Sequence, residues 1–379
     1  MRKCNKMKVG LVPLLYNEYN YGGVLQFYAL QHILRTNGIV TDILFFDNEE
    51  KICEIENKNA NILHLKQFAY FILHCNRNYL INKNTKRRNK KIDLFKEKYY
   101  SQLTDTKSVN YDEYDAVICG SDQIWNPLWA RKRCFLTFVP DTVNKIIYAA
   151  SLGCEKMTEQ EKQVFKPAIE RLQHVSVREY SAQKILSSFI ENKDIPVVLD
   201  PTLLLSADEW RKIMCPYRQN GYVFTYFLGE YREKINLIKN FAAKRGLKIV
   251  NIPFASGETL DSNHFGDKKI IDADPSEFLG LIYGAEYVFT DSFHACVFSV
   301  LFKKQFFVFE RDNSKKMQGR IETLLKNFDL PSRNITINTN IELVPKLVFD
   351  KNEQLQNNMR EKSLEYLFGG IQNEVKSKN

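Results

Sequence analysis

The sequence of 379 residues predicts an α/β protein built from two doubly wound parallel sheets. Short continuous apolar segments of strand length alternate with amphipathic segments of helix length, which is the pattern of parallel strands covered on both faces. This alternation runs through the chain twice, with a break near residues 200–220. At about 150 residues per domain, the length also fits two domains.

The first βαβ unit lies at the N-terminus. A strand at 9–15 is followed by a polar loop at 16–23, a helix at 24–37 and a second strand at 40–46. Apolar residues that recur on one face indicate the helix, and Gly38 is placed to end it. Two strands joined by a crossover helix predict neighbouring parallel strands.

The same alternation predicts the remaining elements. In the first half we expect strands at 115–119, 146–150, 175–177 and 197–199, and helices at 158–173 and 179–189. In the second half we expect helices at 207–213, 230–245, 275–283 and 294–302, and strands at 222–228, 248–253, 287–290 and 306–309. A charged helix follows from 352 to about 368, where Gly369 and Gly370 end or break it. The expected domains are 1–205 and 206–350, followed by a C-terminal helix and tail at 351–379.

Composition and charge exclude several classes of protein. Apolar residues make up 44% of the chain and charged residues 26%, so a disordered, collagenous or coiled-coil protein is excluded. The net charge of +9 favours an anionic substrate or a membrane surface over nucleic acid. Eight scattered cysteines without a C-x-x-C pair predict reduced thiols and no zinc or iron–sulfur site. We expect a cytoplasmic protein, because neither a membrane-spanning segment nor a signal peptide is evident.

Ligands of doubly wound sheets bind where the strands end, so the loops that leave the strands carry the candidate residues. In the first loop, the N–H groups of Gly22 and Gly23 could approach an anion at the start of a helix, close to Gln26. The alternative is a tight turn in which Asn20 only caps the helix.

The loop after the strand at 115–119 combines hydroxyl, carboxylate and amide groups with an indole. Ser121, Asp122, Gln123 and Asn126 surround Trp125, and this mixture of polar groups and an apolar platform is typical of sugar binding. The alternative is a network of turn hydrogen bonds that merely ends the strand.

Two further strand ends carry a cation or an imidazole. Arg178 could bind a carboxylate or phosphate through its planar fork, although pairing with Glu179 is an equally good interpretation. His294 begins a helix directly after a strand, where it could exchange protons with a substrate or simply pack. Triad hydrolase, zincin and P-loop signatures are absent from the sequence.

The polar segments at the strand ends form an ordered set of six motifs. They are Asn20–Gln26, Gly120–Asn126, Tyr148–Ser151, Ser176–Glu179, Asp200–Thr202 and Asp291–His294. In this order they resemble the motifs of the polysaccharide pyruvyl transferase family, over about residues 8–325. The resemblance implies two Rossmann-like domains of glycosyltransferase-B type with an interdomain cleft. It also implies phosphoenolpyruvate as donor and, as acceptor, a sugar diol of a capsule, an exopolysaccharide or a lipid-linked precursor.

The resemblance also implies roles for individual residues. His294 is the expected general acid or base, and Asp122 orients the acceptor or acts as base. Arg178 is the expected donor clamp, with Arg320 and Arg311 as alternatives. Ser292 stands where family members often carry arginine, so the expected donor site departs from the family there. The remaining candidates are expected to bind substrate: Asn20, Gly22, Gly23, Gln26, Ser121, Gln123, Trp125 and Asn126. We expect neither a metal nor a cofactor, and the N-terminal domain is the expected acceptor side.

Two other functions remain open on the same architecture. One is a nucleotide-sugar glycosyltransferase, and the other is a carbohydrate-binding relative that lacks catalysis.

The segment 62–91 joins an apolar stretch to six basic residues, which suggests peripheral contact with an anionic membrane. A core helix followed by a solvated basic loop is the alternative. The six basic residues are Lys83, Lys86, Arg87, Arg88, Lys90 and Lys91.

Overall fold

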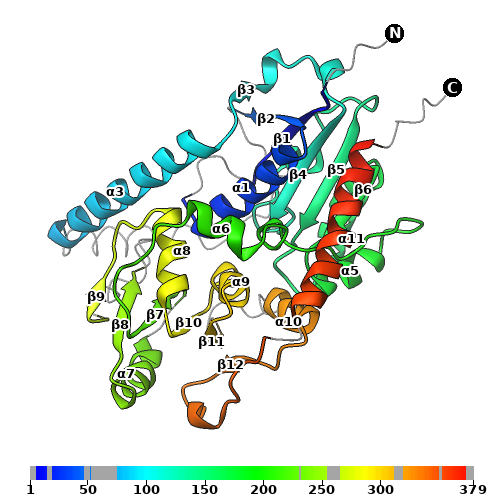
Figure 1. Cartoon of the computed structure of the whole chain (residues 1–379). Helices are drawn as coiled ribbons and strands as arrows, with labels where there is room; N and C mark the ends of the chain where they lie inside the picture. Colours follow the sequence, from blue (N-terminus) through cyan, green and yellow to red (C-terminus); the bar gives the residue numbers. More distant parts are fainter. Residues whose placement is uncertain are drawn as a thin grey trace.

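The computed structural model of the chain describes most of both halves. The described residues are 6–14, 19–46, 52, 75–229, 232–253, 265–310, 319–349 and 352–372, without the side chains of 75–82, 352 and 353. Arg311 and the apolar stretch at 62–73 lie outside them. Figure 1 shows two α/β units, each a sheet flanked by helices, with the N-terminal sheet above the C-terminal one.

The N-terminal sheet has six parallel strands in the order β3-β2-β1-β4-β5-β6. These strands are β1 Lys8–Val12, β2 Val40–Phe45, β3 Leu103–Asp105, β4 Ala116–Asp122, β5 Asn144–Ala150 and β6 His174–Val177. The helices of this half are α1 Tyr21–Thr36, α3 Cys75–Tyr99, α4 Glu159–Glu170 and α5 Tyr180–Ser187. All seven residues of β4 and of β5 are buried, which explains the short apolar segments at 116–119 and 146–150 in the sequence.

The C-terminal sheet repeats this topology, with the order β12-β11-β10-β7-β8-β9 and all strands parallel. Its strands are β7 Tyr222–Tyr226, β8 Lys248–Ile252, β9 Lys268–Lys269, β10 Tyr287–Thr290, β11 Gln305–Phe309 and β12 Asn334–Ile335. The helices are α6 Ala207–Ile213, α7 Ile235–Lys244, α8 Pro275–Gly284, α9 Phe293–Leu301, α10 Gly319–Asn327 and α11 Asn352–Gln372. Counted within each half, both sheets have the Rossmann order 3-2-1-4-5-6. The predicted fold class of two doubly wound, Rossmann-like domains is therefore confirmed.

Helix α1 of the first half packs against helices of the second half. The ring of Tyr21 stacks on Phe278 of α8 at 4.7 Å between centroids, and its hydroxyl donates to the Ala273 carbonyl at 2.8 Å. Further along α1, Tyr28 lies against Trp210 of α6, with 5.6 Å between ring centroids. These aromatic contacts fix the start of α1 against the C-terminal domain.

Several predicted boundaries differ from the structure. Helix α1 begins three residues earlier than expected, so that Gly22 and Gly23 belong to its first turn. Of the strand expected at 197–199, the described contact is a single parallel bridge from Val197 to Val177. The expected helix at 230–245 is shorter, because residues 232–234 form a 3₁₀ turn before α7.

The C-terminal helix returns to the N-terminal sheet. Gly369 and Gly370 neither end nor break α11, which continues to Gln372. The helix packs on β5 (Figure 1), and a Cβ on Gly370 would lie only 3.2 Å from Ile146, so glycine permits this close approach.

Helix α3 contains the basic residues of the segment 62–91. The alternative of a solvated basic loop is wrong, because residues 83–91 are helical. Among the described helices, none is both long and apolar enough to cross a bilayer.

Candidate active site

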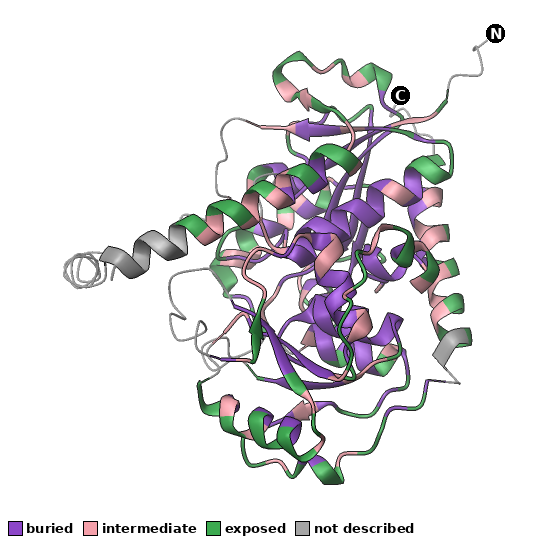
Figure 2. Cartoon of the chain, turned by 60° about the vertical axis from the view of Figure 1, so that its left-hand side comes forward, coloured by how far each residue is buried: buried purple, intermediate pink, exposed green. Residues whose placement is uncertain are grey.

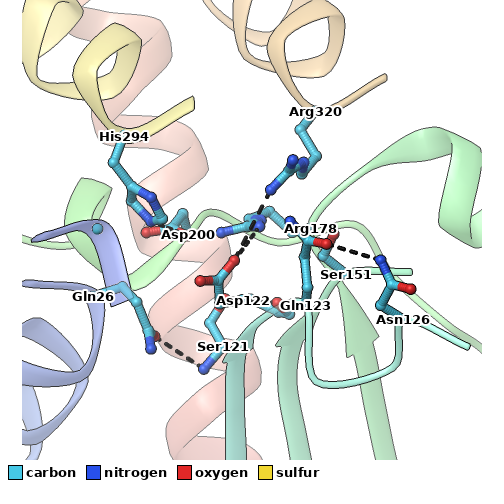
Figure 3. Close-up of polar contacts among 12 residues, drawn as sticks. Gln26, Ser121, Asp122, Gln123, Asn126, Ser151, Arg178, Asp200, His294 and Arg320 are labelled. Carbon is cyan, nitrogen blue, oxygen red and sulfur yellow. Dashed lines mark hydrogen bonds and ion pairs between the residues drawn. The ribbon is translucent and has the colours of Figure 1, made fainter. Parts of the chain in front are cut away.

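The candidate site lies where the strand order of each sheet reverses. These switch points fall between β1 and β4 in the first sheet and between β7 and β10 in the second. The segments after β1, at the end of β4 and after β10 carry Gly22, Asp122 and His294. Figure 3 shows Asp122 and His294 facing a common polar cluster with Arg178, Asp200 and Arg320.

Arg178 forms the centre of this cluster. Its Nη1 donates to Asp200 Oδ2 at 2.5 Å, and its Nη2 donates to Asp122 Oδ1 at 3.0 Å. The guanidinium carbon also lies 4.4 Å from the ring centre of Phe293. Only 2% of the Arg178 side chain is exposed, and both of its Nη atoms are bonded to the two aspartates. It is therefore placed to support the site, and the expected role as an open donor clamp does not fit this geometry.

Asp200 is a central residue to which the sequence analysis assigned no role. It is buried, and its Oδ1 accepts from the amide of Thr202 at 2.9 Å and from its hydroxyl at 2.6 Å. Burial raises the pKa of Asp200, but Arg178, His294 and Thr202 more than offset this and hold the pKa well below its usual range. The Asp-Pro-Thr motif was the available signal, because aspartate followed by proline often starts a turn.

His294 is held between Asp200 and Gly22. Its Nε2 lies 3.6 Å from Asp200 Oδ2 and has no hydrogen-bond partner among the described residues. On the other side, a Cβ built on Gly22 would lie 2.0 Å from Nδ1, so only glycine leaves room for the ring. The Gly22 amide donates to Asn20 Oδ1 at 2.9 Å, which makes Asn20 the helix cap. Gly22 thus leaves the space that the imidazole occupies. Its amide donates to Asn20, so the prediction that this amide points toward an anion is wrong.

Asp122 and Arg320 are the more exposed charged groups beside Arg178. Their side chains are 11% and 7% exposed, and Arg320 Nη1 lies 3.9 Å from Asp122 Oδ1. Burial raises the pKa of Asp122, but Arg178, His294 and Arg320 together lower it below the ordinary value. The amide group of Gln123 lies within 3.0 Å of Arg320 Nη1, so its oxygen can accept from the guanidinium.

Glu179 is the third buried carboxyl group of the cluster, and its environment differs. Its Oε1 accepts from Ser151 Oγ at 2.8 Å and from the Leu152 amide at 3.1 Å. Its Oε2 has no hydrogen-bond partner in the described part of the chain and lies 3.9 Å from Arg178 Nε. Burial raises the pKa of Glu179 despite the nearby arginines. The local pairing of Arg178 with Glu179 is thus weak, and the aspartates are the main partners.

Other expected substrate contacts hold the loops together. Ser121 donates its amide to Gln26 Oε1 at 3.0 Å and its hydroxyl to the Ala149 carbonyl at 2.7 Å. Ser292 is the N-cap of α9, where its hydroxyl accepts from the Ala295 amide. Because Ser121, Gln26 and Ser292 are buried, their contacts position the backbone of the site.

The expected sugar platform at Trp125 is wrong, and a neighbouring tryptophan is the exposed one. Trp125 is fully buried, stacks on Phe135 at 5.4 Å and donates to the Cys134 carbonyl, so it belongs to the core. Trp129, which the sequence analysis did not select, is 36% exposed and donates to the Gln123 carbonyl at 3.2 Å. The sequence signal for Trp129 was its position four residues after Trp125.

The structure adds little to four remaining predictions. Asn126 lies beside Gln123, with 2.9 Å between Asn126 Nδ2 and the nearest atom of the Gln123 amide group. Gly23 is buried in the first turn of α1, and Arg311 lies outside the described residues. Within those residues, no cluster of three or more His, Cys, Asp or Glu side chains could hold a metal ion, and metal independence stays a prediction.

Comparisons with known proteins complete this description. No curated protein sequence is significantly similar to the chain. Among solved structures, the glycosyltransferase SnogD from Streptomyces nogalater is 10% identical with a TM-score of 0.46, and 96% of each chain is covered. The UDP-N-acetylglucosamine 2-epimerase from Rickettsia bellii is 10% identical with a TM-score of 0.44, and 97% of each chain is covered. The heptosyltransferase WaaC from E. coli, solved with ADP, is 12% identical with a TM-score of 0.40, covering 95% of this chain and 100% of the other.

The comparison with protein families is decisive. The sequence model described as polysaccharide pyruvyl transferase matches residues 20–313, which is most of the chain. That range contains all six sequence motifs, including those that supply Asp122, Arg178, Asp200 and His294. The chain therefore belongs to the polysaccharide pyruvyl transferase family.

Proposed function

We propose that the protein transfers the pyruvyl group of phosphoenolpyruvate to two hydroxyls of a sugar, forming a cyclic ketal and releasing phosphate. One observation carries this proposal: Asp122, Arg320 and His294 form a cluster at the candidate site, where the strand order of each sheet reverses. These residues supply a base, an anion-binding cation and a proton-exchanging group. Family membership supports the transfer of a pyruvyl group.

The reaction needs one proton delivered and two removed. A proton adds to the methylene carbon of the enol, which becomes a methyl group, while the first sugar hydroxyl bonds to the neighbouring carbon and loses its proton. The second hydroxyl then bonds to that carbon as the carbon–oxygen bond to phosphate breaks, and its proton leaves with the phosphate. In this scheme His294 is the general acid and Asp122 the general base.

The surrounding residues suit these roles. Asp200 Oδ2 lies 3.6 Å from His294 Nε2, so a carboxylate lies directly beside the imidazole that acts as the acid in this scheme. The low pKa of Asp122 keeps that carboxylate ready to accept a hydrogen bond from a sugar hydroxyl.

We assign the donor clamp to Arg320, because Arg178 is committed to Asp122 and Asp200. A guanidinium binds a carboxylate or a phosphate through two parallel hydrogen bonds.

Each domain then has its own task. The N-terminal domain, which carries Asp122 and the exposed indole of Trp129, is proposed as the acceptor side. Sugar rings commonly pack against exposed aromatic faces while polar groups bind their hydroxyls. The C-terminal domain, with His294 and Arg320, is proposed as the donor side. The acceptor is proposed to be lipid-linked and presented at the cytoplasmic face of the membrane.

The test is a donor screen with a galactose-type lipid-linked acceptor. Phosphate release from phosphoenolpyruvate, together with a ketal mass gain on the acceptor, is the expected result. Turnover of a nucleotide sugar with no reaction of phosphoenolpyruvate would overturn the proposal in favour of a glycosyltransferase. Sugar binding without transfer from any donor would instead indicate a carbohydrate-binding protein.

A further inference from the structure

Most of the net positive charge of the chain is carried by one helix. The sequence of α3, Cys75–Tyr99, contains nine basic and two acidic residues, for a net charge of +7. The whole chain has a net charge of +9, so the other residues together contribute only +2. Figure 1 and Figure 2 both show α3 extending outward from the two domains. The charge is therefore concentrated on an element that a partner can approach.

Five of the basic residues of α3 fall into two groups with different surroundings. Arg87 Nη2 lies 2.7 Å from Asp272 Oδ2, and Lys91 Nζ lies 3.1 Å from Glu277 Oε2. These two pairs join α3 to the segment at the start of α8, so they are contacts within the protein.

The second group faces solvent. Lys83, Lys86 and Lys90 are exposed, and none of them forms an ion pair with any described residue. At 3.6 residues per turn these three lysines fall within about 60° of the helix circumference, and Leu94 and one exposed acid, Glu97, lie on the same face. Leu94 is 53% exposed, although it is a large apolar side chain. One face of α3 thus presents unpaired cations next to an exposed leucine.

We propose that this face of α3, formed by Lys83, Lys86, Lys90 and Leu94, docks on an anionic lipid bilayer. Lysines attract anionic headgroups while an adjacent apolar side chain enters the headgroup boundary, as in helices that lie on membranes. Nucleic acid is the less suitable partner, because the sequence outside α3 has a net charge of only +2 and tight nucleic-acid binding needs many phosphate contacts. The surface deepens the proposed function, since it would hold the enzyme where a lipid-linked acceptor is presented.

The experiment measures partition onto phosphatidylcholine vesicles with and without phosphatidylglycerol. The test variant carries Lys83→Gln, Lys86→Gln and Lys90→Gln. At about 1 kcal/mol per cation near an anionic surface, the partition coefficient on anionic vesicles should fall about 100-fold at low salt. Added salt should weaken binding of the wild type, because the Debye length is only about 8 Å at physiological ionic strength.

A matched control removes the same charge elsewhere. It carries glutamine in place of three exposed lysines on other elements and loops: Lys156, Lys212 and Lys239. This control should bind anionic vesicles within a few-fold of the wild type. The proposal is overturned if the wild type does not prefer anionic vesicles, if the control loses as much binding as the test variant, or if duplex DNA binds as tightly as the vesicles.

Activity is measured in parallel on a soluble acceptor, so that failure of the docking surface can be distinguished from failure of the proposed function. The test variant should release phosphate from phosphoenolpyruvate at the wild-type rate, since its three lysines lie outside the site. Vesicle binding without any pyruvyl transfer by the wild type would refute the proposed function alone. Normal transfer with unchanged vesicle binding in the test variant would refute the docking surface alone.

Discussion

Replacing Gly22 by alanine tests the contact between the two domains at the candidate site. Gly22 lies in the first turn of α1, where alanine suits the backbone and should by itself stabilise the helix by about 0.5–1 kcal/mol. The added Cβ, however, would lie 2.0 Å from His294 Nδ1 and 2.5 Å from its Cγ. Since real Cβ contacts stay beyond 3.0 Å, the imidazole or α1 has to move by at least about 1 Å.

This displacement should reduce catalysis more than stability. Overpacking of this kind costs about 1–3 kcal/mol, so after the helix gain the free energy of unfolding should fall by no more than about 2.5 kcal/mol. A misplacement of about 1 Å in a catalytic group can reduce turnover about 100-fold. We therefore expect Gly22→Ala to fold and to lose about two orders of magnitude in kcat for pyruvyl transfer.

The assay combines phosphate release with an NMR titration of the imidazole of His294, which does not depend on the identity of the substrate. The control is Gly369→Ala, because Gly369 is also helical and a Cβ there has no neighbour within 4 Å. That control should keep full activity and gain slightly in stability. A Gly22→Ala protein with wild-type turnover and an unchanged imidazole signal would refute the proposed packing of His294 on Gly22.

Three further predictions concern the charged cluster. His294→Ala should remain folded and lose about 10² to 10⁴-fold in turnover, and near-normal rates would make His294 structural. Arg320→Lys should raise KM for phosphoenolpyruvate, because lysine lacks the planar fork, whereas Arg178→Lys should mainly lower the melting temperature; the reverse pattern would return the clamp to Arg178. The pH dependence of stability should separate the carboxyl groups. The lowered pKa of Asp200 contributes stability above about pH 4 that is lost as the pH falls, and Asp200→Asn should remove this acid-sensitive part. The raised pKa of Glu179 has the opposite effect on stability. Its contribution to the free energy of unfolding is complete below about pH 4 and is lost as the pH rises. Glu179→Gln should therefore gain in melting temperature relative to the wild type as the pH rises from 4, and parallel curves for the two proteins would contradict the assignment.

The order of strands and helices could be predicted from the sequence, because it depends on local periodicity. Strands β4 and β5 are buried on both faces and therefore contain short apolar segments at 116–119 and 146–150, while the one-sided burial of α4 and α5 leaves an amphipathic pattern. The short edge strands β3, β9 and β12 have only two or three residues each, too few to show a period, and they were missed. Helix α10 was not predicted either. The prediction that the C-terminal helix ends or breaks at Gly369 and Gly370 was also wrong. Packing of α11 on β5 outweighs the low helix propensity of two glycines.

The candidate site could be located from the sequence, but the roles of its residues could not. Loops that leave parallel strands meet at one edge of a sheet, so Asp122, Arg178 and His294 were found by position alone. Which charges pair depends on distances between residues far apart in the chain. Arg178 proved to be neutralised by Asp122 and Asp200, which lie 56 and 22 residues away in sequence. Similarly, both Trp125 and Trp129 are visible in the sequence, yet only the tertiary structure determines which indole the core buries. Local sequence therefore predicts which groups reach the site, whereas the packing of one domain against the other decides which of them remain available to a substrate.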